Sequence, residues 1–249
     1  GRGNGGTEGR LLLLSARNLV SRTAPYDLVR KMRASVLVLG PLLARAGYAR
    51  VSMPGGCAIG PRPIDLHVAG LRQLGAEISL RDGYIEARAP GGLIGTPIVL
   101  PRVSVGATEN LLMAASLADG ETTISNAARE PEVLDLANCL IKMGARIDGA
   151  GTEEVRVSGV GRLGSAEHDV LPDRIETATY AVAAAITGGK IDLTGTRLDL
   201  IQSVADKFHA VGVELRTQND GLEVCCDGNR LEAVNIETGP YPGFPTDMQ

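Results

Sequence analysis

Apolar positions recur along this chain first at the spacing of a helix and then at the spacing of a strand. Leu200, Val204, Phe208 and Val211 follow one another at steps of four, four and three, which places them on one helical face. Alternating residues such as 77–80 and Asp-Gly turns then predict two antiparallel strands. The pattern therefore predicts an amphipathic helix followed by a hairpin, and it occurs three times.

Each of these three helices is followed by a glycine. Gly75, Gly144 and Gly212 are almost evenly spaced along the chain. Glycine is the residue that most readily takes the left-handed conformation just beyond the last turn of a helix. The regular spacing predicts an internal repeat of about 69 residues.

A second kind of helix repeats at the same interval. Residues 107–118 and 177–186 are rich in alanine and lack a polar stripe, and residues 33–46, which end before Gly47, are an earlier copy at a looser spacing. Helices with few polar residues belong inside a structure, flanked by other layers. Each repeat therefore reads as strand-helix-strand-helix-strand-strand, and the chain is predicted to have an α/β fold made of βαβαββ units.

The two ends of the chain fall inside this pattern. Residues 5–14 are predicted to be the closing hairpin of a unit, and Thr246 lies one repeat length after Thr177, where another helix is expected to begin. We expect the sequence to be an internal fragment, incomplete at both ends.

Composition excludes several classes of partner. The net charge is −4, no run of Lys or Arg stands out, and aromatic residues make up 3% of the chain, so no nucleic-acid partner is expected. No apolar run approaches the ~18 residues of a membrane helix, so no membrane partner is expected. Four cysteines and three histidines without metal-type spacing predict no metal site and a reducing, cytoplasmic setting.

The densest candidate for chemistry is the loop around Cys57. Residues 54–67 contain three Gly and three Pro, which exclude a helix or an interior strand over most of this segment. Cys57 is predicted to lie exposed beside Arg62 and near a helix N-terminus, and both neighbours favour the thiolate. The alternative is a structural turn with an incidental cysteine. Cys139, Cys225 and Cys226 are interpreted as structural.

Three further segments each admit two interpretations. Arg102 and Ser104 join a strand to an alanine-rich helix, where they would suit an anion such as a diphosphate, or Ser104 is simply an N-cap. Arg33 opens another such helix with the same ambiguity. Asp247 is either an N-cap or a catalytic base. Residues 173–176 are interpreted as a cap with surface charge, and the three histidines are assigned no role.

Several ordered motifs together resemble the enolpyruvyl transferase family, in particular its members that use UDP-N-acetylglucosamine as the acceptor. The motifs are residues 54–67, 102–106, 126–132, 171–177 and 244–249. The resemblance implies an inside-out α/β barrel of two domains, each of three repeated units, with the active site between them. It also implies that residues 1–171 are part of the cysteine-loop domain and that residues 172–249 start the second domain.

The reaction implied by this resemblance moves the enolpyruvyl group of phosphoenolpyruvate to the 3′-hydroxyl of UDP-N-acetylglucosamine and releases phosphate. It is the first committed step of peptidoglycan synthesis, is blocked by fosfomycin, and needs neither a cofactor nor a metal. Such an addition and elimination requires an acid at the methylene carbon, a base for the hydroxyl, and cations for the phosphate.

The resemblance also assigns roles to individual residues. Cys57 matches the general acid and Asp247 the residue that deprotonates the hydroxyl, while Arg33 and Arg62 match substrate-binding arginines. The stretch that holds the uridine end is matched by Pro63, Ile64, Asp65 and Leu66. The segment around the nucleotide is matched by Arg102, Val103, Ser104 and Val105, and the family commonly has Lys at the position of Arg102.

Two alternatives stay open at this point. One is a non-catalytic relative that binds a nucleotide sugar, and the other is an enolpyruvyl transferase with a different acceptor, such as shikimate 3-phosphate. The family's Lys-Asn pair and its phosphoenolpyruvate-binding arginines have no counterpart here, so we expect the isolated chain to be inactive.

Overall fold

The computed structural model describes residues 11–53, 64–226 and 231–248. The chain divides into two compact units. The larger unit is Leu19–Asp169, and the smaller unit combines Gly1–Asn18 with Val170–Gln249. The predicted assignment of residues 1–171 and 172–249 to two domains of a barrel stays a prediction.

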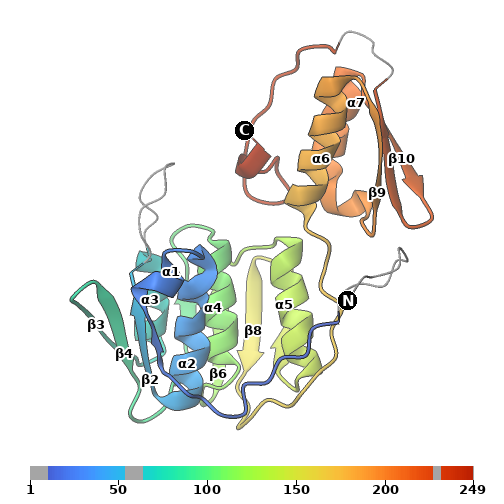
Figure 1. Ribbon diagram of the computed structural model, residues 1–249. Coiled ribbons are helices and arrows are strands. Elements are labelled where there is room, and N and C mark those ends of the chain that lie inside the picture. The colour runs from blue at the N-terminus through green and yellow to red at the C-terminus, as the bar shows by residue number, and fades with distance from the viewer. Residues whose placement is uncertain (1–10, 54–63, 227–230, 249) are drawn as a thin grey trace. The chain divides into compact units, whose positions relative to one another are not determined.

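The larger unit holds two four-stranded sheets and the helices that cover them (Figure 1). Its elements in chain order are β1 (Thr23–Ala24), α1 (Tyr26–Val29), η1 (Arg33–Val38), α2 (Leu39–Ala46), β2 (Tyr48–Ser52), α3 (Asp65–Gln73), β3 (Glu77–Arg81), β4 (Tyr84–Arg88), β5 (Pro97–Val99), α4 (Val105–Ala115), β6 (Glu121–Ser125), α5 (Pro131–Lys142), β7 (Arg146–Asp148) and β8 (Glu154–Ser158).

Both sheets have the same construction. The strand orders are β1-β2-β4-β3 and β5-β6-β8-β7, with one parallel pair followed by antiparallel pairs. A parallel pair needs a crossover, which η1 and α2 supply in one sheet and α4 in the other. The predicted mixture of helices and hairpins is therefore confirmed for this unit.

Helix α4 is the central helix of the larger unit and packs against α2, α3 and α5 (Figure 1). It has almost no polar face, and its alanines and leucines are buried, as is Asn110. The prediction that this alanine-rich segment lies inside the structure is confirmed.

The predicted helix over residues 33–46 is interrupted. Residues 33–38 form the 3₁₀-helix η1, and the α-helix begins only at Leu39. In a continuous α-helix the ring of Pro41 would clash with the carbonyl of Leu37, and the Gly40 N–H would donate to the Val36 carbonyl. The Asn110 side chain bridges these two groups instead: its Oδ1 accepts from the Gly40 N–H at 2.7 Å, and its Nδ2 donates to the Val36 carbonyl at 3.3 Å.

Two glycines allow the neighbouring helices to approach α4 this closely. A Cβ at Gly40 would lie 2.2 Å from Asn110 Oδ1 and 2.5 Å from the Asn110 carbonyl oxygen. A Cβ at Gly70 of α3 would lie 2.7 Å from two methyl carbons of Leu111. The Asn110 carbonyl oxygen belongs to the backbone of α4, so the packing of α2 requires glycine at position 40, whereas the atoms that face Gly70 are the end of the Leu111 side chain.

The smaller unit has one three-stranded antiparallel sheet covered by two helices (Figure 1). Its strand order is β10-β11-β9. Its elements are α6 (Arg174–Thr187), β9 (Lys190–Thr194), η2 (Leu198–Ile201), α7 (Gln202–Val211), β10 (Glu214–Gln218), β11 (Gly221–Cys225) and η3 (Thr246–Met248).

The predicted residues at the helix termini are confirmed in both units. Gly75, Gly144 and Gly212 have φ values of 93°, 101° and 93°, which confirms the predicted left-handed conformation. Asp173 caps α6 by accepting from the backbone N–H groups of Ile175 and Glu176, as predicted.

Helix α6 differs from the prediction that it is enclosed. Its alanines at 178, 181, 184 and 185 are buried, but Tyr180 is 52% exposed and Ile186 is 73% exposed. No described element of the smaller unit covers that face, so α6 is buried on one side only.

The N-terminal apolar run also departs from its prediction. Residues 11–14 form no strand, and their leucines are between 74% and 94% exposed. A strand needs a hydrogen-bonded partner, and the described residues offer none to this segment.

No helix among the described residues is long and apolar enough to span a membrane.

The close approach at Gly40 gives a stability prediction. Gly40→Ala should lower the free energy of unfolding by about 2–3 kcal/mol, because the added methyl forces α2 away from α4. Urea unfolding of the 249-residue chain measures this. Gly91→Ala is the matched control: a Cβ there meets nothing within 4 Å, and the change should stay within about 0.5 kcal/mol. Equal effects of the two substitutions would contradict the packing argument.

Candidate functional site

The N-termini of α3 and α4 lie side by side in the larger unit, joined by an ion pair. Arg102, in the segment that leads into α4, donates from Nη2 to both carboxylate oxygens of Asp65 at 3.0 and 3.1 Å. Asp65 is the first residue of α3. Both side chains are about half exposed, so the pair lies at the surface and its charges are accessible to a ligand.

The first turn of α4 presents backbone donors. Ser104 is the N-cap: its Oγ accepts from the Ala107 N–H at 3.3 Å, and its carbonyl accepts from the Thr108 N–H at 3.0 Å. Among the described residues, nothing accepts a hydrogen bond from the N–H groups of Val105 and Gly106. Free amides at a helix N-terminus favour an anion.

Behind this turn, α3 and α4 are joined by a buried polar contact. His67 Nδ1 lies 3.0 Å from Asn110 Nδ2, and His67 is 7% exposed. Burial lowers the pKa of His67 below its ordinary value, and the Asp65 carboxylate opposes that effect. On its other side the ring lies against Gly106, where a Cβ would come within 3.2 Å of Cε1.

The structure groups some of the predicted site residues. Ile64 is the N-cap residue of α3, Leu66 is buried, and Asp65 contacts Arg102 across 37 residues of sequence. Val103, Ser104 and Val105 continue from Arg102 into α4. Both predicted nucleotide segments therefore meet at one place on the larger unit.

Other predicted residues are not placed. Cys57, Arg62 and Pro63 lie outside the described residues. Arg33 begins η1, and its side chain likewise lies outside the described part. Their roles stay predictions.

Asp247 lies in the smaller unit, exposed in the short 3₁₀-helix η3. Its segment is anchored on both sides: Ser203 Oγ of α7 donates to the Gly243 carbonyl at 3.2 Å, and Phe244 is buried. The contact between Thr179 Oγ1 and Met248 Sδ, at 3.9 Å, ties the same segment to α6. These anchors leave the Asp247 carboxylate free to face solvent or a ligand.

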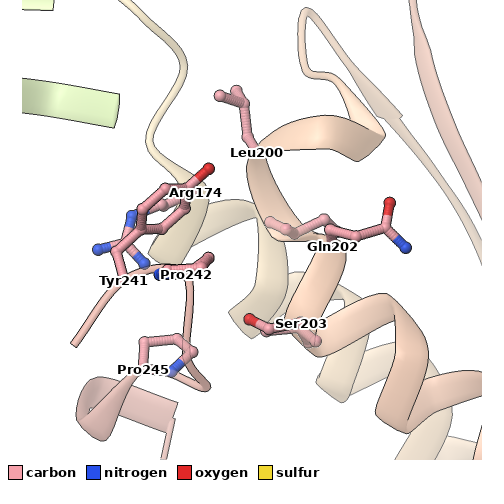
Figure 2. Close-up of a pocket in the computed structure, with 9 residues that line it drawn as sticks. Arg174, Leu200, Gln202, Ser203, Tyr241, Pro242 and Pro245 are labelled. Atoms are coloured by element: carbon pink, nitrogen blue, oxygen red, sulfur yellow. The ribbon is translucent and has the colours of Figure 1, made fainter. Parts of the chain in front are cut away.

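A small cavity lies next to the Asp247 segment, between the first turns of α6 and α7 (Figure 2). The Arg174 guanidinium carbon lies 5.8 Å from the centroid of the Tyr241 ring, and Pro242 and Pro245 complete that side. The cavity volume is about 30 Å³, which holds one or two waters and no substrate. Among the described residues, no group of three or more His, Cys, Asp or Glu could hold a metal ion.

The sequence matches, over residues 10–249, the family described as EPSP synthase (3-phosphoshikimate 1-carboxyvinyltransferase). The chain belongs to this family. The resemblance to enolpyruvyl transferases is thereby confirmed.

Curated relatives in this family share most of the chain. It is 59% identical over 248 residues to a UDP-N-acetylglucosamine 1-carboxyvinyltransferase of Rhodospirillum centenum, covering 99% of this chain and 57% of the relative. It is 62% identical over 241 residues to one of Granulibacter bethesdensis, covering 97% and 57%. The chain therefore spans less than two thirds of the length of these relatives.

Two solved structures share the fold. The enolpyruvyl transferase NikO from Streptomyces tendae matches with a TM-score of 0.70 at 23% identity, covering 91% of this chain and 54% of that chain. EPSP synthase from Acinetobacter baumannii matches with a TM-score of 0.61 at 22% identity, covering 82% and 48%. These likenesses establish the enolpyruvyl transferase fold.

A carboxyl group on α4 has a raised pKa. Glu109 is half-buried, and burial followed by repulsion from Glu132 and Glu130 raises its pKa to about 7. The two neighbours lie at the start of α5. Because the folded chain holds this proton more tightly than the unfolded chain, Glu109 makes the fold less stable as pH rises from about 4.5 towards 7.

Glu109→Gln should therefore raise the free energy of unfolding at pH 8 by about 1–2 kcal/mol after solvent screening is allowed for, with little effect at pH 5. Denaturant unfolding at both pH values measures the difference. Glu132→Gln, which removes one of the two repelling charges, should reproduce part of the effect. Parallel pH profiles for the wild-type chain and the Glu109 variant would exclude this explanation.

Proposed function

We propose that this chain is part of a UDP-N-acetylglucosamine 1-carboxyvinyltransferase. The protein would transfer the enolpyruvyl group of phosphoenolpyruvate to the 3′-hydroxyl of UDP-N-acetylglucosamine and release phosphate, in the cytoplasm, as the first step of peptidoglycan synthesis. The observation that carries the proposal is the 57–62% identity to relatives of that name over 97–99% of the chain.

The geometry of the larger unit supports a nucleotide-sugar site. The N–H groups of Val105 and Gly106 and the guanidinium of Arg102, which Asp65 also binds, place hydrogen-bond donors at one helix start. A diphosphate, with its negative charge and many acceptor oxygens, fits such a set. Asp65, held by Arg102, is a hydrogen-bond acceptor, and in this proposal Pro63–Leu66 contacts the uridine end, with Arg33 as a further substrate-binding residue.

The proposed chemistry is an addition followed by an elimination. Asp247 takes the proton of the 3′-hydroxyl while the hydroxyl oxygen bonds to C2 of phosphoenolpyruvate. Cys57 gives a proton to the C3 methylene. In the second half, C3 loses a proton, the double bond re-forms and the C2–O bond to phosphate breaks. Arg62 is assigned to the phosphate. The sum is one phosphate released for each enolpyruvyl group transferred.

The finer architecture is also part of the proposal. We infer that the repeated βαβαββ units build an inside-out barrel of two domains and that residues 1–171 and 172–249 belong to different domains. The shared strand order of the two sheets in the larger unit supports a repeated unit.

The acceptor separates this proposal from the alternative transferase. The intact protein that contains this chain should release phosphate from phosphoenolpyruvate when UDP-N-acetylglucosamine is added and not when shikimate 3-phosphate is added. Release with shikimate 3-phosphate alone would assign the other acceptor. Saturable nucleotide-sugar binding without turnover would point to a binding protein.

Asp247→Asn should lower kcat of the intact protein by roughly 10²-fold or more, because the general base is lost, while Asp247→Glu should keep part of the activity.

The thiol of Cys57 has its own test. Incubation of the intact protein with UDP-N-acetylglucosamine and fosfomycin should add one adduct, which peptide mapping places on Cys57 and not on Cys139, Cys225 or Cys226, because only an activated thiolate reacts quickly. Cys57→Ser should show no adduct. An unmodified Cys57 in folded, nucleotide-bound protein would remove it from the mechanism.

A further inference from the structure

The segment that leads to Asp247 has few internal constraints. Five of the seven residues at 239–245 are glycine or proline. Proline has no backbone N–H to donate, and glycine has the widest conformational freedom of any residue. A backbone hydrogen bond from the Gly239 N–H to the Phe244 carbonyl, at 3.0 Å, closes the segment on itself. This bond shapes the loop, but it does not attach the loop to the rest of the smaller unit.

Phe244 and Ser203 make that attachment. The Phe244 side chain packs in the core of the smaller unit and is 9% exposed. Ser203, in the first turn of α7, donates from Oγ to the Gly243 carbonyl at 3.2 Å, in a partly buried hydrogen bond (Figure 2). Among the described residues, this hydroxyl and this carbonyl have no other hydrogen-bond partner. Apolar packing is non-directional, so the hydrogen bond is the contact that gives the segment a direction.

The polar contact on the other side of Asp247 is weaker. Thr179 has a single hydroxyl hydrogen, and the Ile175 carbonyl accepts it at 2.7 Å. Met248 Sδ lies 3.9 Å from the same oxygen, and a thioether sulfur is a weak acceptor. The hydrogen bond from Ser203 is therefore the stronger of the two polar restraints on the segment.

The chain between this hydrogen bond and Asp247 is short and stiff. Gly243 lies four residues before Asp247. The ring of Pro245 fixes its own φ, and the Pro245 carbonyl accepts from the Met248 N–H at 3.1 Å within η3. A restraint on the Gly243 carbonyl is therefore transmitted to the Asp247 carboxylate.

We propose that Ser203 is a positioning residue for Asp247: its hydroxyl binds the Gly243 carbonyl and thereby sets where the carboxylate meets the acceptor hydroxyl. This inference rests on the proposed function, because that function makes Asp247 the base. A general base acts within hydrogen-bond reach of the proton that it takes, roughly 2.6–3.2 Å. A misplacement of about 1 Å can cost on the order of 10²-fold in rate. Ser203 acts on the substrate only through Asp247.

Removal of the hydroxyl tests this role in the intact protein that contains this chain. Ser203→Ala should lower kcat for phosphate release by about 5- to 20-fold and keep KM for both substrates within about 2-fold, because the substrates still bind while the base is less well placed. Thr187→Ala is the matched control, since that hydroxyl bonds within α6 to the carbonyls of Ala183 and Ala184. Its kcat should not change, and a comparable loss in both variants overturns the proposal.

Two larger side chains separate the hydrogen bond from packing. Threonine and valine have nearly the same shape, but only threonine has a hydroxyl. The cavity of about 30 Å³ that Ser203 lines gives room for an added methyl group. Ser203→Thr should therefore keep most of kcat, and Ser203→Val should lose as much as Ser203→Ala does. Equal kcat values for the threonine and valine variants would contradict a role for the hydrogen bond.

A double substitution tests whether Ser203 acts through Asp247. In an Asp247→Asn background the base is already lost, so Ser203→Ala should lower kcat no further. A loss in that background as large as the loss in the wild-type background would reveal a general structural effect and overturn the positioning role.

The outcomes distinguish the two levels of inference. An impaired Asp247→Asn variant beside a Ser203→Ala variant with wild-type kcat overturns the role of Ser203 and leaves the proposed function standing. A folded wild-type protein without turnover, or full activity of Asp247→Asn, contradicts the proposed base itself, and the role of Ser203 falls with it.

Discussion

The larger unit depends on the buried amide of Asn110, which occupies the place of a helix hydrogen bond. Oδ1 and Nδ2 satisfy the Gly40 N–H and the Val36 carbonyl, the pair that a regular α-helix would have joined directly. An unsatisfied buried backbone group costs roughly 1–3 kcal/mol. The Val36 carbonyl also accepts from the Leu39 N–H, so it is the Gly40 N–H that relies on α4 lying close enough to deliver this side chain, and glycine at position 40 permits that approach.

The same amide sets the position of the candidate site. Its second hydrogen contacts His67 of α3, so one side chain of α4 fixes α2 and α3 together. The exposed Asp65–Arg102 pair also links the starts of α3 and α4, but an exposed ion pair contributes only about 0–1 kcal/mol. The buried contacts therefore determine how precisely the two predicted nucleotide segments meet, and the Asp65–Arg102 pair stays at the surface.

Features that depend on residues close together in the sequence were predicted correctly. The stop glycines at 75, 144 and 212, the Asp173 cap and the burial of α4 follow from nearest neighbours and periodicity. The interruption at Leu39 did not follow, because Asn110 is far from Gly40 in the sequence and sits in a helix that reads as apolar. The buried contact of His67 with Asn110 did not follow either, because its partner lies on another helix. Only Pro41, which resists the interior of a continuous helix, was a local signal of the break.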